Sequence, residues 1–159
     1  MPKPVRDITF GPWTKWTDRG TSRTDTAHGG VYLFAYCPAV RPPAVPTVDQ
    51  LPQEVVYVGD AKNLNRRPLS GVHHRLQRYE QLFGDPRKTL FVTVAPLYQT
   101  TCVEPHVERA FSFYTEAQLV WNYTDRHGHP PAMHYKDKGA RPDWVVRAVK
   151  RLRQTQADR

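Results

Sequence analysis

Three short runs of β-branched and aromatic residues, each close to glycine or proline, constrain the fold most. They cover residues 31–36, 54–58 and 89–95. Composition of this kind is typical of strands. The segment from residue 38 to 52 contains five prolines, which forbid regular structure there, so it predicts a loop joining an antiparallel pair.

Helical periodicity appears between and after these runs. Val72, Leu76, Tyr79 and Phe83 recur at helical spacing before Gly84, which predicts a helix over 72–83. A longer helix is expected from residue 101 or 104 to about 122. The residues expected on its inward side are Val107, Ala110, Phe111, Tyr114 and Gln118.

A basic terminal helix is expected over residues 142–153. Its predicted inward side consists of Trp144, Val145, Ala148, Val149 and Leu152. Together these elements predict an α+β fold, with a small three-stranded, mainly antiparallel sheet flanked by helices.

The chain length and charge limit the class of protein. A chain of 159 residues suffices for one hydrophobic core and is too short for two. The formal net charge of +8 favours polyanionic partners. No apolar run approaches the roughly 20 residues that span a bilayer, and residues 1–7 lack a signal-peptide stretch. We expect a cytoplasmic protein with no membrane partner and with Cys37 and Cys102 reduced.

An ordered set of polar motifs is superimposed on this pattern. Gly-Val-Tyr at residues 30–32 and Tyr-Val-Gly at 57–59 are followed by Asn63, Arg67, a His-His-Arg step, and then a glutamate and Asn122 in the long helix. In this order the motifs resemble the GIY-YIG nuclease family, over about residues 29–122. The resemblance implies a nuclease domain over 29–125, an N-terminal arm over 1–28 and a basic extension over 126–159 packed on the same domain.

The resemblance also implies a site. Tyr32 and Tyr57 correspond to the paired catalytic tyrosines, and Arg67 to the catalytic arginine. Glu108 corresponds to the single metal-binding carboxylate, and Asn122 to a supporting asparagine. The family's activity would make this chain a metal-dependent hydrolase that cuts DNA phosphodiester bonds, as restriction or phage-related members do.

Phosphodiester hydrolysis needs an activated water, neutralisation of the phosphate charge and help for the leaving oxygen. One Mg²⁺ or Mn²⁺ ion on Glu108 would supply the last two, and the planar guanidinium of Arg67 would bind the phosphate. A phenol with a pKa near 10 is a poor base at neutral pH. Tyr32 or Tyr57 would therefore need an arginine, Lys62 or a metal-bound water to lower its pKa, or would position the water instead.

The register of the arginine leaves two assignments open. The family places a His or Tyr four residues after its arginine, and Gly71 stands there after Arg67. A small insertion would make His73 or His74 the partner of Arg67. The alternative pair is Arg75 with Tyr79, which has the four-residue helical spacing.

Basic residues near the C-terminus suggest the contact with nucleic acid. We expect DNA as the partner, with RNA not excluded, and a homodimer is an option if two strands are cut. The expected contact residues are Lys136, Lys138, Arg147, Lys150 and Arg151. The alternative function is a non-catalytic nucleic-acid-binding module with the same fold.

Overall fold

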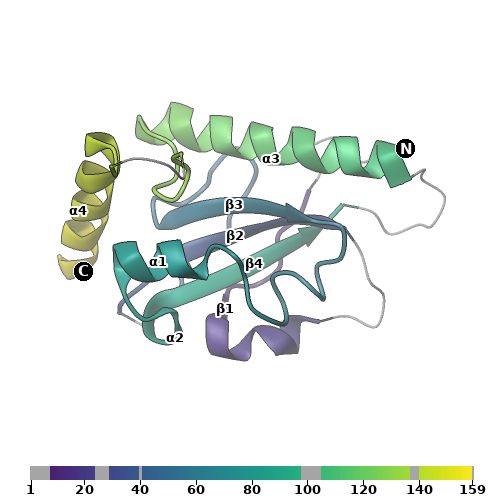
Figure 1. The fold of residues 1–159 in the computed structure, drawn as a ribbon, viewed down its shortest axis with the longest axis horizontal. Coiled ribbons are helices and arrows are strands. Elements are labelled where there is room, and N and C mark those ends of the chain that lie inside the picture. Colours follow the sequence, from purple (N-terminus) through teal and green to yellow (C-terminus); the bar gives the residue numbers. More distant parts are fainter. Residues whose placement is uncertain (1–7, 24–28, 40, 98–104, 137–139, 159) are drawn as a thin grey trace.

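The computed structural model describes residues 8–23, 29–39, 41–97, 105–136 and 140–158, apart from the side chains of Pro105 and Glu108. The chain forms an α+β fold around one antiparallel sheet with strand order β1-β4-β2-β3 (Figure 1). Strands β2 (Gly30–Tyr36), β3 (Val55–Ala61) and β4 (Leu90–Pro96) confirm the three predicted strands within a few residues.

The sheet has four strands, where the sequence predicts three. The additional strand β1 (Thr14–Lys15) pairs with β4 through Thr14 and Val92. Two residues are too short to show an alternating pattern, so sequence periodicity does not reveal this strand. A 3₁₀ helix, η2 (Trp16–Ser22), follows it and buries Trp16 against the sheet.

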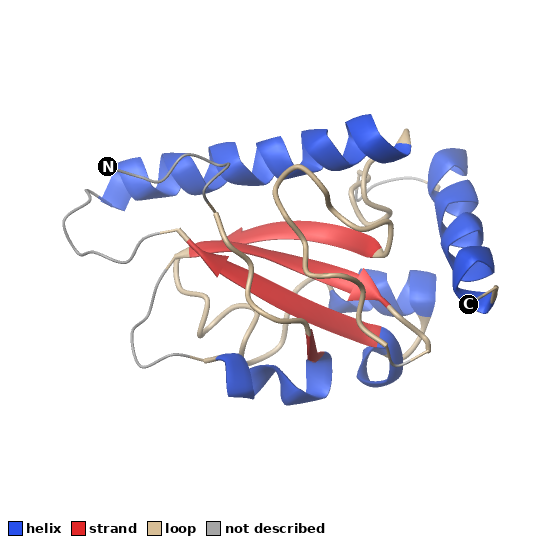
Figure 2. Cartoon of the chain, turned by 180° about the vertical axis from the view of Figure 1, so that it is seen from behind, coloured by secondary structure: helices blue, strands red, loops and turns tan. Residues whose placement is uncertain are grey.

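The two faces of the sheet carry separate cores. Tyr32, Phe34 and Tyr57 belong to one face, together with residues of α1 (Leu76–Phe83) and α4 (Asp143–Ala157). Val31 and Leu33 point to the other face, since side chains alternate along a strand. There they pack with residues of α3 (Pro105–His127) and of the proline-rich loop. Figure 2 shows the chain from behind, with α3 running along the sheet.

Helix α1 is shorter than predicted. It begins at Leu76 rather than near Val72, whose side chain is 95% exposed. Gly71 has a φ of +68°, which ends regular structure before the helix and lets residues 72–75 form a separate turn. This turn buries His73 under the sheet, so it is central to the site described below.

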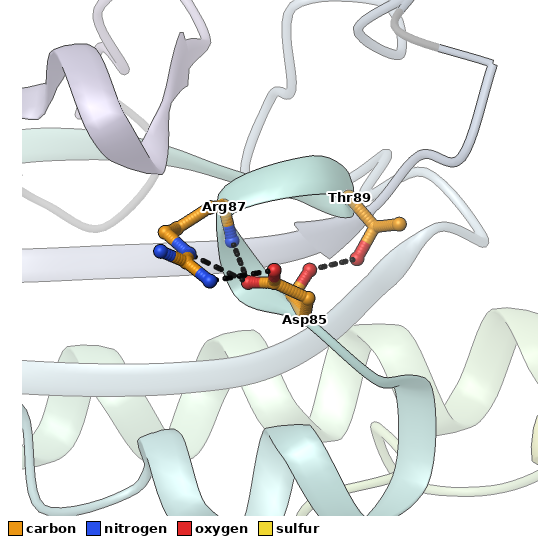
Figure 3. A network of polar contacts seen from close by, with 3 residues as sticks. All are labelled: Asp85, Arg87 and Thr89. Atoms are coloured by element: carbon orange, nitrogen blue, oxygen red, sulfur yellow. Dashed lines mark hydrogen bonds and ion pairs between the residues drawn. The ribbon is translucent and has the colours of Figure 1, made fainter.

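A short helix, α2 (Pro86–Thr89), links α1 to β4 and was not predicted. Asp85 is its N-cap and accepts a hydrogen bond from the backbone N–H of Arg87 (2.9 Å), while the guanidinium of Arg87 folds back onto the same carboxylate (3.2 and 3.1 Å; Figure 3). Thr89 closes the turn by donating its hydroxyl to the carbonyl of Asp85 (3.3 Å).

Helix α3 extends five residues beyond its predicted end, and its inward face differs from the predicted one. The buried side chains are those of Ser112, Thr115, Leu119 and Tyr123, whereas Tyr114 is 59% exposed. The terminal helix α4 agrees with the prediction, because Val145, Ala148 and Leu152 are buried in the core. Within the described ranges, no helix combines the length and apolarity that a membrane crossing requires.

Candidate active site

The β2–β3 pairing places the two motif tyrosines on one face of the sheet. Tyr32 lies opposite Gly59 and Tyr57 opposite Phe34, which brings the two phenol rings to a centroid distance of 6.0 Å. A β-carbon on Gly59 would lie 2.4 Å from Cζ of Tyr32. The glycine of the Tyr-Val-Gly motif is therefore the residue that makes room for the first tyrosine.

His73 completes the first part of the site from the turn before α1. Its Nε2 lies 2.5 Å from Oη of Tyr32, and its Nδ1 accepts a hydrogen bond from the backbone N–H of Arg75 (3.0 Å). Burial, together with the positive charges of His74, Arg67 and Arg75, lowers the pKa of His73 to about 3. The ring is thus neutral, and because Nδ1 accepts, the proton is on Nε2.

This tautomer gives the hydrogen bonds of the site a direction. His73 donates to Tyr32, so the hydroxyl proton of Tyr32 is directed to Tyr57. Burial and the neighbouring Tyr57 raise the pKa of Tyr32 far above its usual value. Burial also raises the pKa of Tyr57, but the charge and hydrogen bond of Arg75 and the hydrogen bond from Tyr32 act against it. Tyr57 is thus the tyrosine whose oxygen is best prepared to carry negative charge.

Tyr57 opens into a cleft of about 410 Å³. Its cationic lining includes Arg75, Arg78 and Lys136, and Glu116 of α3 provides a carboxylate. The remaining lining residues are Met133, His134 and Tyr135. A mainly cationic cleft with one acidic position suits a phosphate-bearing ligand.

Residues 133–136 form one wall of the cleft, and two of them cover the outer edge of β3. The N–H of Met133 donates to the carbonyl of Val56 (3.0 Å), and the N–H of Val58 donates to Nε2 of His134 (2.9 Å). The imidazole of His134 stacks on the ring of Tyr57 at 5.0 Å. Burial and the charges of Arg75 and Arg78 lower the pKa of His134 to about 4, which keeps Nε2 free to accept.

Arg78 anchors this wall to α1. Its Nη1 donates to the carbonyls of Met133 (3.1 Å) and Tyr135 (2.8 Å), and its guanidinium lies 3.9 Å from the centroid of the Tyr135 ring. The sequence offered no signal for this wall, since residues 127–136 have no periodicity and lie about fifty positions beyond α1 in the chain.

The acidic side of the site is a pair of carboxyl groups. Asp60 follows the Tyr-Val-Gly motif on β3 and accepts a hydrogen bond from Arg109 of α3 (2.6 Å). Glu116 shares a hydrogen bond with Asp60, and its burial and the charge of Asp60 raise the pKa of Glu116 well above its ordinary value. Glu116 therefore keeps its proton near neutral pH, in the hydrogen bond that it shares with Asp60.

These two carboxyls fit a hard divalent cation better than a transition metal. Mg²⁺ takes one or two carboxylates and keeps several waters, so a pair of oxygen ligands is sufficient. A cation would also replace the proton that the pair now shares. Among the described residues, no group of three or more His, Cys, Asp and Glu side chains could hold a metal.

The structure brings several of the predicted catalytic residues together. Tyr32, Tyr57 and His73 form one hydrogen-bonded group, and Arg75, the alternative arginine, joins it. His74 is exposed and stacks on His73 at 4.7 Å. Arg67 is exposed and outside the cleft lining, although its charge acts on Tyr32 and His73.

Other predicted residues lie elsewhere. Tyr79 is buried and its hydroxyl contacts that of Thr89 (2.8 Å), away from the cleft lining. The side-chain amide of Asn122 donates to the carbonyl of Val48 (3.0 Å), so it anchors the proline-rich loop to α3. Lys62 is exposed next to Ala61 at the end of β3.

The predicted nucleic-acid contacts are divided between two places. Lys136 lines the cleft, whereas Arg147 and Arg151 of α4 line a separate pocket of about 230 Å³ with Trp144, and Lys150 is exposed on the same helix. Lys138 and the side chain of Glu108 lie outside the described part of the chain.

Comparison with known proteins adds no relative. No protein-family model matches this chain, and neither the curated proteins nor the solved structures contain a match.

Proposed function

We propose that this protein is a metal-dependent endonuclease that hydrolyses DNA phosphodiester bonds at the Tyr57 cleft, in the manner of the GIY-YIG nucleases that its motifs resemble. One observation supports this most strongly. The hydrogen bonds run from the Arg75 backbone through His73 and Tyr32 and end on the oxygen of Tyr57, which lines the cationic cleft.

In this mechanism Tyr57 is the general base. As a phenolate it accepts from Tyr32 and from Arg75, and its remaining lone pair takes a proton from the attacking water. Tyr32 and His73 are positioning residues, because each acts on the reaction through Tyr57. Since burial raises the pKa of Tyr57, the phenolate is scarce at neutral pH and becomes more abundant as pH rises.

The cationic side chains of the cleft bind the phosphate. Arg75 is placed to contact both Tyr57 and a phosphate oxygen, and Lys136 adds charge from the facing wall. Negative charge develops on the phosphate oxygens in the transition state, where preorganised donors contribute most.

Glu116 and Asp60 are the residues that would hold Mg²⁺ or Mn²⁺. When bound, the ion would supply charge neutralisation for the phosphate and for the leaving oxygen. Glu108, eight residues before Glu116 on α3, remains the alternative carboxylate from the family resemblance.

The test is cleavage of supercoiled plasmid and of labelled single-stranded DNA and RNA, with Mg²⁺, Mn²⁺ or EDTA. We expect metal-dependent cutting of DNA by the wild type, loss of cutting in Tyr57→Phe and Glu116→Gln, and wild-type cutting in Glu80→Gln, whose glutamate is exposed on α1. If the wild type binds DNA and never cuts with any metal or substrate, the protein is the non-catalytic binding module instead.

A further inference from the structure

A second pocket lies between the end of α3 and helix α4. Its volume is about 230 Å³, and it is lined by the last residue of α3, the turn that follows and part of α4. Figure 1 shows α4 beside the C-terminal end of α3. Among the described residues, none that lines this pocket also lines the Tyr57 cleft, so the two are separate places.

The α3 side of the pocket is formed by a reversal of the chain at a glycine. Gly128 has a φ of +81°, and its N–H donates to the carbonyl of Thr124 (2.8 Å), a common way for a helix to end. The reversal brings the rings of His127 and His129 against the same ring, that of Tyr123, at centroid distances of 4.4 and 5.9 Å.

Hydrogen bonds fix both imidazoles. Nε2 of His127 donates to the carbonyl of Leu51 (2.8 Å), and Nδ1 of His129 donates to the carbonyl of Pro130 (2.7 Å), since a carbonyl oxygen can only accept. The Tyr123 ring against which they pack is buried. This wall is therefore formed before a ligand arrives, and binding does not have to order it.

The α4 side of the pocket combines one aromatic ring with two cations. Trp144, Arg147, Ala148 and Arg151 follow one another at helical spacing, which places them on one face of α4. Because Ala148 is the smallest of the four, the helix surface is lowest at its position. The part-exposed indole of Trp144 lies 6.2 Å from the imidazole of His129, between ring centroids, so aromatic rings from both walls meet at the pocket.

The two arginines of the pocket do not hold the fold together. Arg78 and Arg153 do so, because each donates to backbone carbonyl groups of another element. Within the described part of the chain, the guanidinium groups of Arg147 and Arg151 form no ion pair or hydrogen bond, and both residues are exposed. No described carboxylate lines the pocket either, so both charges are available to an anion.

We propose that this pocket binds one nucleotide of a single-stranded nucleic acid, with its base against the ring of Trp144 and its phosphate on Arg147 and Arg151. Aromatic rings that stack on bases and cations that follow the backbone are the two contacts by which proteins hold such strands. The planar fork of a guanidinium also matches two oxygens of one phosphate. The volume is below the roughly 300–1,000 Å³ of pockets for drug-sized ligands, which suits a single nucleotide.

A single strand suits the pocket better than a duplex. The bases of a duplex are stacked on one another, whereas unpaired bases can turn outward and stack on a protein ring. His129 of the pocket and Lys136 of the Tyr57 cleft are seven residues apart, so they lie within about 25 Å of each other. One strand of several nucleotides can therefore reach both places.

The first test is fluorescence anisotropy of a labelled single-stranded oligonucleotide of about ten nucleotides, in EDTA so that no metal-dependent cleavage occurs. Arg147→Gln and Arg151→Gln should each lower affinity about tenfold, as expected for a lost hydrogen bond to a charged group. Lys88→Gln, which removes one exposed charge from α2, should bind like the wild type. Equal losses in all three variants would mean that only net charge matters, and would overturn the proposal. So would a duplex of the same length that binds as tightly as the single strand.

The second test follows the base through tryptophan emission. The oligonucleotide should quench emission of the wild type and of Trp121→Phe, whose indole is exposed on α3, but not of Trp144→Phe. Trp144→Phe should keep most of the affinity, because phenylalanine still stacks. Quenching that persists in Trp144→Phe would place the base elsewhere and overturn the proposal.

Competition identifies which part of the ligand the pocket binds. Deoxyadenosine monophosphate should displace the oligonucleotide more effectively than inorganic phosphate does, and more weakly than an unlabelled strand does. If inorganic phosphate competes as well as the mononucleotide, the base contact is wrong. If the mononucleotide binds as tightly as the strand, the ligand is a free nucleotide instead. None of these measurements requires cleavage, so they remain decisive even if the proposed nuclease activity fails.

Discussion

Gly59 lies directly across the β2–β3 ladder from Tyr32, and the phenol of Tyr32 occupies the space that a side chain at position 59 would need. The glycine is thus required by the position of a tyrosine on the neighbouring strand, rather than by its own backbone angles.

Gly59→Ala should therefore destabilise the protein and displace Tyr32. The new β-carbon would lie 2.4 Å from Cζ and 2.5 Å from Oη of Tyr32, and overpacking of this kind costs roughly 1–3 kcal/mol of the free energy of unfolding. Thermal unfolding would measure this loss of stability as a lower melting temperature. Gly20→Ala is the matched control, because nothing lies within 4 Å of its β-carbon position. Equal melting temperatures for the two variants would contradict this packing.

The two tyrosines should differ in their effect on the rate. Tyr57→Phe removes the proposed base and should lower kcat on the order of 10²-fold or more, whereas Tyr32→Phe removes one donor to it and should cost about tenfold. Because the pKa of Tyr57 is raised, the wild-type rate should increase steadily with pH above neutrality. Tyr32→Phe should shift this rise to higher pH. A larger loss in Tyr32→Phe than in Tyr57→Phe would reverse the two roles.

Substituting Arg75 and Arg67 separately would show which of the two is the catalytic arginine. Arg75 hydrogen-bonds to Tyr57 and lines the cleft, whereas Arg67 is exposed outside that lining. Arg75→Ala should lower kcat/KM by about 10²-fold, and Arg75→Lys should recover part of it, because lysine keeps the charge and loses the planar fork. Arg67→Ala should have less than about a tenfold effect. The opposite ranking would restore Arg67 as the catalytic arginine.

Metal binding should depend on Glu116 and on pH. The shared proton must leave before a cation binds, so Mg²⁺ affinity measured by calorimetry should increase with pH and binding should release protons. Glu116→Gln should abolish binding. Glu108→Gln is the comparison, and loss of binding in that variant alone would place the metal at the earlier carboxylate.

Acid stability should depend on His73. In the unfolded chain the His73 ring takes up a proton near pH 6.5, whereas in the folded protein it does so only near pH 3. Between these two values the unfolded state binds more protons than the folded state. The free energy of unfolding therefore decreases as pH falls through this interval. Between pH 6.5 and 4 the loss of stability should be on the order of 3 kcal/mol. His73→Gln keeps a donor toward Tyr32 and does not titrate. Chemical denaturation of this variant between pH 7 and 4 should show a shallower pH dependence than wild type.

Much of the sheet could be predicted from the sequence, because every residue of β2 and most of β3 are buried and such strands form unbroken apolar runs. The face of α3 could not. A helix that is apolar on two sides has no single hydrophobic stripe, so Tyr114 and Leu119 are equally plausible inward residues until the sheet is in place.

Some residues of the candidate site could be predicted from the sequence and others could not. The two tyrosines and His73 were identifiable because they lie in or near short motifs. Arg75 was the alternative arginine, because the Asn-Leu-x-x-Arg sequence after the Tyr-Val-Gly motif favours Arg67. The segment between Arg67 and α1 is not helical, so four-residue helical spacing does not apply there. Glu116 and His134 reach Tyr57 through tertiary contacts alone, which sequence spacing does not record.

The hydrogen bonds of Met133 and His134 to β3 also cover the outer edge of the sheet. An edge strand with free N–H and C=O groups is a template for another strand. Here Met133 and His134 occupy the outward groups of Val56 and Val58. Protonation of His134 near pH 4 would remove the acceptor for the N–H of Val58, so acid should weaken the cover of this edge and favour association between copies through it.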